Sequence, residues 1–103
     1  MWAQLITMRF QPGKEPGLKE MIEQLRAAEQ PNSGLVRHIA MQDQDDPSRF
    51  LMLALFESEE AARARENDSR RAEGLKAMRA TMTQIIDGAP EFTNLNVVYE
   101  LTE

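Results

Sequence analysis

The amino-acid sequence predicts an α+β fold of the ferredoxin-like type, in which a four-stranded antiparallel sheet is built in the order βαββαβ. Three observations support it: an apolar run in mid-chain, two segments with apolar residues at helical spacing, and strand-like segments near both ends. The run Arg49–Phe56 is typical of a strand buried on both faces. Right-handed crossovers place the first and third strands at the sheet centre. At 103 residues, we expect one domain over 1–103.

The first half of the chain predicts a strand, a helix and a second strand. Ala3–Phe10 alternates as a strand does, and Pro12-Gly13 favours a turn after it. Pro16 suits the first turn of a helix. The apolar residues that follow at helical spacing are Leu18, Met21, Ile22, Leu25 and Ala28. Leu35–Gln42 has mixed polarity, which favours a strand nearer the edge of the sheet.

The polar turn Asp43–Ser48 joins the second strand to the apolar run. Its three aspartates lack the spacing, the glycine and the final glutamate of a calcium loop. We interpret the turn as a solvated loop and predict no metal site.

The second half predicts a broken helix and a last strand. Ser58 is a good N-cap for a short helix over Ala61–Arg65, and Asp68-Ser69 can cap a second helix. That helix has an apolar stripe and ends before Pro90. The members of the stripe are Leu75, Met78, Met82, Ile85 and Ile86. The last strand is predicted over Phe92–Leu101.

Basic residues gather in this broken helix, interleaved with acidic ones. We interpret them as a solvated helical surface, and an anion site is the alternative. The basic residues are Arg63, Arg65, Arg70, Arg71, Lys76 and Arg79.

Composition excludes several classes of function. The net charge of −5 disfavours binding to nucleic acid, because an acidic surface repels phosphates. Without cysteine there is no disulfide or thiolate chemistry. The N-terminus does not have the pattern of a signal peptide, and no segment is long and apolar enough to span a bilayer. We expect a cytoplasmic protein with no membrane contact.

The central strands are apolar on both faces, which predicts assembly. When helices cover one face of a four-stranded sheet, the other face is expected to be polar. Here Leu51, Leu53 and Leu55 lie on one face of the strand and the residues between them, which are also apolar, lie on the other. An uncovered apolar patch of this kind marks an interface. We therefore predict a homodimer in which two sheets pack face to face.

Several side chains are candidates for chemistry. His38 is the one histidine and suits acid–base work, although strand histidines are more often rim residues. Asn94 and Asn96 share a strand face, and if that face is buried their amides need hydrogen-bond partners. A ligand could supply these partners, and the alternative is the interface with a partner subunit. Tyr99 is expected in the core with its hydroxyl at the rim. Six methionines could line an adaptable apolar cavity, and the alternative is that they fill the core. They are Met8, Met21, Met41, Met52, Met78 and Met82.

The chain resembles the antibiotic biosynthesis monooxygenase family, part of the dimeric α/β-barrel superfamily. The resemblance rests on the turn after Phe10 and on Phe56-Glu57-Ser58-Glu59-Glu60-Ala61 before a broken helix. Members often carry a Trp at the end of strand three, an acidic-Ala pair and then a His. Phe56, Glu60-Ala61 and Arg65 stand at these positions.

The resemblance implies a dimeric barrel and a monooxygenase that needs no cofactor. Its substrate would be a small aromatic or quinol-like compound in a cavity between sheet and helices. Haem-degrading members use three residues at positions that hold Ile6, Arg65 and Leu75 here, so no haem is expected.

Two functions stay open on the sequence. One is this monooxygenase, and the other is a non-catalytic dimeric barrel that binds a small ligand or serves as an accessory protein. The candidate binding residues are His38, Arg65, Asn94, Asn96 and Tyr99.

Overall fold

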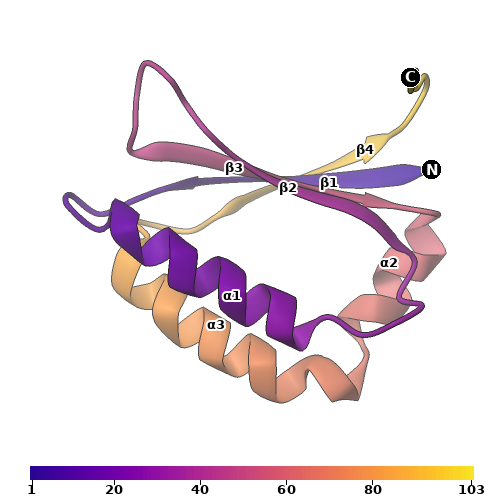
Figure 1. Ribbon diagram of the computed structural model, residues 1–103, viewed down its shortest axis with the longest axis horizontal. Helices are drawn as coiled ribbons and strands as arrows, with labels where there is room; N and C mark the ends of the chain where they lie inside the picture. The colour runs from indigo at the N-terminus through magenta and orange to yellow at the C-terminus, as the bar shows by residue number, and fades with distance from the viewer.

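The computed structural model, which describes residues 1–103, is a four-stranded antiparallel sheet with its helices on one face (Figure 1). The strands are β1 (Trp2–Arg9), β2 (Leu35–Gln42), β3 (Arg49–Phe56) and β4 (Glu91–Asn96). The helices are α1 (Leu18–Ala28), α2 (Glu59–Glu66) and α3 (Ala72–Ile85), with short 3-10 turns at Glu15–Gly17 and Ser69–Arg71. The strand order β2-β3-β1-β4 confirms the predicted ferredoxin-like fold and its central pair.

Side-chain caps satisfy free N–H groups at the start of α2 and of the 3-10 turn before α3. The Ser58 hydroxyl accepts from the Ala61 N–H at 3.1 Å and caps α2, as its sequence predicts. The Asp68 carboxylate accepts from the Arg70 N–H at 3.0 Å and starts the turn that leads into α3. The second of these caps therefore fixes where α2 ends and the turn into α3 begins.

Helices α1 and α3 lie side by side under the sheet (Figure 1). They approach closely at Gly74 and Ala28, since a Cβ on Gly74 would lie 2.6 Å from the Ala28 Cβ. Only a residue without a side chain allows this spacing. The two small residues therefore set how closely the helices pack.

The core lies between the helices and the sheet in two clusters. The larger cluster includes the stacked rings of Phe10 and Phe50, with centroids 4.4 Å apart. The smaller cluster lies at the other end, where Trp2 packs against Phe56 and Ala62. The apolar run β3 contributes to both clusters, so it joins the two ends of the core.

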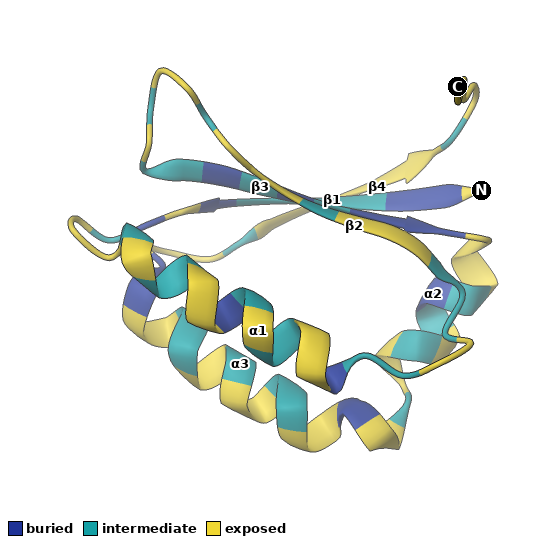
Figure 2. Ribbon diagram, viewed as in Figure 1, coloured by how far each residue is buried: buried dark blue, intermediate teal, exposed yellow.

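The sheet face away from the helices is open. The pairing register aligns Ile39, Leu53 and Leu5 in one row across β2, β3 and β1. Further apolar side chains on this face are Met41, Leu51 and Leu95. The β2–β3 loop and the C-terminal tail both rise on this side, as Figures 1 and 2 show. No element of the chain covers the centre of the face.

The last strand is shorter than predicted. β4 ends at Asn96, whereas the sequence predicts a strand to Leu101. Asn96 is paired with Trp2, the first residue of β1, and the last backbone bond runs from the Val97 N–H to the Met1 carbonyl. Beyond this point β4 has no neighbouring backbone to pair with. Tyr99 is therefore 78% exposed in the tail, and its expected place in the core is wrong.

None of the helices is both long and apolar enough to cross a membrane.

Candidate functional site

A hollow of about 500 Å³ lies between the sheet and the helices, and we call it the central hollow. Its volume falls in the range of small-molecule sites. Residues from all four strands and all three helices line it. Its apolar wall includes five methionines, Met8, Met21, Met52, Met78 and Met82. Methionine side chains adapt to irregular apolar ligands.

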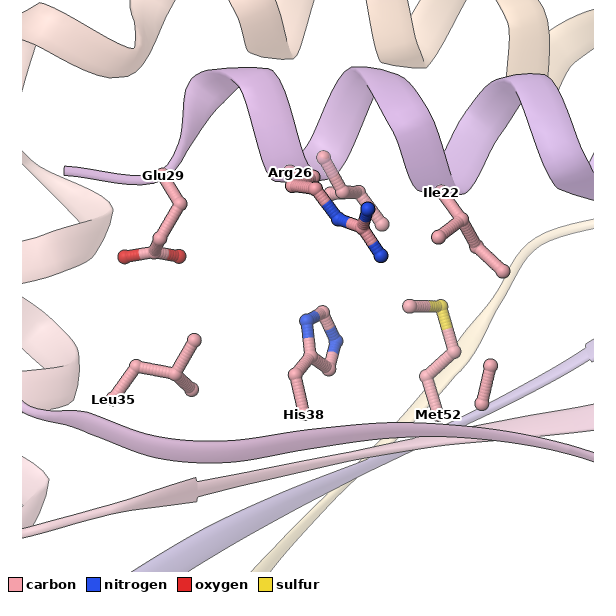
Figure 3. A pocket seen from close by; sticks show the side chains of 8 residues that line it. Ile22, Arg26, Glu29, Leu35, His38 and Met52 are labelled. Carbon is pink, nitrogen blue, oxygen red and sulfur yellow. The ribbon is translucent and has the colours of Figure 1, made fainter.

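A smaller hollow of about 220 Å³ opens between α1 and β2, and we call it the side hollow. Figure 3 shows Arg26 and His38 pointing into it from α1 and β2. It shares Leu25, His38 and Met52 with the central hollow. His38 therefore stands where the two hollows meet.

His38 is an exposed side chain on the helix-facing side of β2, where its register partner is Ala54. It makes no hydrogen bond within the chain, so both ring nitrogens are free. Desolvation and then the Arg65 charge lower its pKa below the ordinary histidine value, against an opposing effect of Glu29. The imidazole is therefore neutral at pH 7 and can accept a proton.

Arg65 on α2 is held by Glu29, which follows α1. Its Nε and Nη2 donate to the Glu29 carboxylate, with an Nη2–Oε2 distance of 2.6 Å. The guanidinium carbon also lies 5.5 Å from the centroid of the Phe56 ring. The pair leaves the Arg65 side chain only 11% exposed. The two residues that the family resemblance highlights, Phe56 and Arg65, are thus in contact at one end of the central hollow.

Arg71 is a wall residue that the sequence reasoning misses. It ends the 3-10 turn before α3, and it is 4% exposed, so the interpretation of this residue as solvated surface is wrong. Its Nη1 donates to the Arg65 carbonyl at 3.1 Å, and its Nε has no acceptor in the chain. The available signal was the pair Arg70-Arg71 at a helix break, where adjacent side chains point in different directions.

The two asparagines lie on the helix-facing side of β4 but outside the hollow. Asn94 accepts a hydrogen bond from the Gln4 side chain at 3.2 Å, and Gln4 lines the central hollow. Asn96 lies opposite Trp2 at the end of the sheet. Of the five predicted site residues, the structure brings together His38 and Arg65, places Asn94 one side chain away, and separates Asn96 and Tyr99 from them.

The acidic turn is satisfied by its own neighbours. Asp46 accepts from Arg9 at 2.8 Å, and Asp43 accepts from Arg49 at 3.2 Å and from two backbone N–H groups of the turn. The Ser48 hydroxyl and then Arg9 lower the pKa of Asp46 to about 2. Hydrogen bonds and ion pairs within the loop therefore explain Asp43 and Asp46 without a bound metal.

Comparisons with known proteins agree on one family. The family model for antibiotic biosynthesis monooxygenase matches residues 1–81. No protein of known, curated function matches the chain in sequence.

Solved structures share the fold at low sequence identity. A candidate antibiotic biosynthesis monooxygenase from Caulobacter crescentus is 21% identical, with a TM-score of 0.76 over 95% of this chain and 90% of that one. One from Nitrosomonas europaea is 18% identical, with a TM-score of 0.75 over 96% and 100%. Rv0793 from Mycobacterium tuberculosis is 12% identical, with a TM-score of 0.74 over 98% of each chain.

Proposed function

The chain belongs to the antibiotic biosynthesis monooxygenase family, and from this we propose that it oxidises a small quinol-like aromatic compound in the central hollow without a cofactor. The observation that carries the proposal is the hollow itself. Its volume of about 500 Å³ and its methionine-rich wall suit a fused aromatic ring system, and its lining also includes polar side chains such as His38 and Arg71.

The proposed reaction needs no electron donor besides the substrate. One atom of O2 bonds to a ring carbon of the quinol, and the other leaves as water with the two hydrogens that the substrate loses. The product is a hydroxyquinone, and one O2 is consumed per quinol. The protein then has to bind the ring, remove a hydroxyl proton and exclude water.

His38 is the proposed base. Its neutral imidazole, free of partners in the chain, can take the proton of a quinol hydroxyl placed in the central hollow. The resulting anion gives up an electron to O2 more readily than the neutral quinol does. The position where family members often carry a His is occupied here by Arg65, so in this proposal the base comes from β2 rather than from the helix.

One observation favours the alternative of a non-catalytic binding or accessory protein. Arg65 is fixed by Glu29, and a guanidinium carries N–H donors but no acceptor atom that could take a proton from the substrate. If His38 also proved dispensable, the hollow would bind a ligand without acting on it.

We also propose that residues 1–103 form one domain that pairs with a second copy through the open sheet face. Members of the family are typically dimers. The row of Ile39, Leu53 and Leu5 lacks a cover within the chain, and a two-fold interface would bury it against itself. The exposed apolar side chains of the tail, including Tyr99, rise on the same side and would be covered as well.

Oxygen uptake tests the proposed activity. The protein is mixed with 1,4-dihydroxynaphthalene and related quinols in an oxygen electrode, with protein-free buffer as the control for autoxidation. We expect protein-dependent uptake of one O2 per quinol without hydrogen peroxide, because autoxidation releases peroxide and the proposed reaction releases water. If oxygen uptake equals that of protein-free buffer for every quinol that binds, the proposed oxidation is wrong and the protein binds its ligand without acting on it.

A further inference from the structure

Arg71 is a buried cation without an anionic partner in the chain. It is 4% exposed and takes part in no ion pair. The single hydrogen bond of its guanidinium runs to the Arg65 carbonyl, and its Nε has no acceptor. A buried charge is costly unless it is paired, so this arrangement calls for an acceptor from outside the chain.

The carboxylates around Arg71 are already engaged by other arginines. Glu29 and Asp68 are the two whose charges act favourably on it. Glu29 is bound by Arg65 at 2.6 Å, and Asp68 is bound by Arg70 at 2.7 Å. Each of these pairs is neutral as a unit. The charge of Arg71 is therefore left over, and the charge of Arg79, which is in no ion pair, adds to the positive potential around it.

The wall of the central hollow is positive although the protein is acidic. The charged residues that line it are Arg65, Arg71, Arg79 and Glu66. Glu29 engages Arg65 and Arg63 engages Glu66, which leaves the charges of Arg71 and Arg79 without a partner. The chain as a whole carries −5. A small anion that enters the hollow thus meets unpaired positive charge and a wall with several methionine side chains.

We infer that Arg71 binds an ionised carboxylate of the ligand, so that the substrate class is an aromatic acid. The inference rests on the proposed function, because it takes the central hollow as the binding site. A carboxylate is ionised at neutral pH, whereas a phenol is not unless the site first removes its proton. The guanidinium fork also matches the two oxygens of a carboxylate. The ring then lies along the methionines, with its hydroxyl side toward His38.

A purely structural role for Arg71 makes a different prediction. Its bond to the Arg65 carbonyl stabilises the C-terminal end of α2, where cations are favourable. If that were its whole role, replacing it would lower the stability of the protein without distinguishing an acidic ligand from a neutral one.

A matched pair of ligands separates the two roles. Binding of 1-hydroxy-2-naphthoic acid and of 1-naphthol is measured by calorimetry under argon, so that no oxidation interferes. The variants are Arg71→Met, Arg71→Lys and, as a control with one charge removed at an exposed position of α3, Lys76→Gln. Circular dichroism confirms that each variant is folded, and Arg71→Lys, which keeps the charge, serves if Arg71→Met does not fold.

We expect the wild-type protein and Lys76→Gln to bind the acid about ten- to a hundred-fold more tightly than the naphthol. Arg71→Met should lose that preference and keep its affinity for naphthol, and Arg71→Lys should keep only part of the preference. Equal binding of both ligands by the wild type, or a preference that survives in Arg71→Met, would overturn the inference. Either result leaves the proposed oxidation of neutral quinols intact, since that is read from oxygen uptake. Absence of binding by both ligands would overturn the inference and the proposed site together.

Discussion

The Arg65 guanidinium binds the Glu29 carboxylate across the gap between α2 and the end of α1, at 2.6 Å between Nη2 and Oε2. Arg65 lines the central hollow, and its guanidinium carbon lies 5.5 Å from the centroid of the Phe56 ring. Desolvation is the largest cause of the lowered His38 pKa, and after it the Arg65 charge lowers the pKa of that histidine and the Glu29 charge raises it. The first prediction follows from these opposite effects.

Removing either member of the pair should move the pKa of His38 in opposite directions. Arg65→Met should raise it, because a repelling positive charge is lost, and Glu29→Gln should lower it, because an attracting negative charge is lost. Proton NMR of the imidazole gives the pKa directly, since the chain has one histidine. Arg63→Gln, an exposed arginine on the same helix, is the control and should leave the pKa unchanged. Shifts of the same sign in both variants would contradict the account.

His38→Ala should slow quinol oxidation by about a hundred-fold, since removal of a general base typically costs 10²–10⁴ in rate. In the wild type, activity should be constant at neutral pH and fall as the pH drops through the lowered pKa of His38, because only the neutral imidazole accepts a proton. The inflection should therefore lie below 6.5, the ordinary histidine value. It is measured from initial rates of oxygen uptake between pH 4.5 and 8. A profile that stays flat in this range would remove His38 as the base.

Gly74→Ala should destabilise the protein, although alanine normally favours a helix. The added Cβ would lie 2.6 Å from the Ala28 Cβ and push α1 away from α3. Overpacking of this kind costs about 1–3 kcal/mol, which urea unfolding resolves. The double variant Gly74→Ala/Ala28→Gly restores the space and should recover part of the loss. No recovery in the double variant would mean that the helices do not meet at this point.

Leu53→Glu should convert the proposed dimer to a monomer. Leu53 lies in the middle of the open sheet face, opposite Leu5 and Ile39, so two copies would bring like charges together in an apolar interface. Sedimentation equilibrium should give about twice 11.8 kDa for the wild type and 11.8 kDa for the variant. Lys19→Glu, an exposed change on α1, should leave the dimer intact. A wild-type mass of 11.8 kDa at every concentration would rule out the dimer.

The sequence predicted the sheet because its strongest signals are local. The run Arg49–Phe56 and the helical stripes determine which elements form, and the right-handed crossover rule determines their order. The end of β4 could not be predicted in this way. It depends on where β1 begins, since Asn96 is opposite Trp2, and such a register is a property of two strands far apart in the chain.

The site was predicted in part for the same reason. His38 stood out as the one histidine and lies where the two hollows meet. Arg71 did not stand out, because alternating charges on a broken helix look like solvated surface. Its burial comes from the turn at Ser69–Arg71, which points one of two adjacent arginines inward. A local charge pattern does not contain that information.

Isotope labelling of the product tests the proposed reaction most directly. The protein is given 1,4-dihydroxynaphthalene under ¹⁸O2, and the product is analysed by mass spectrometry. The account predicts 2-hydroxy-1,4-naphthoquinone with one ¹⁸O atom, formed in proportion to the protein and about a hundred-fold more slowly with His38→Ala. Unlabelled 1,4-naphthoquinone and peroxide at the rate of protein-free buffer would contradict it.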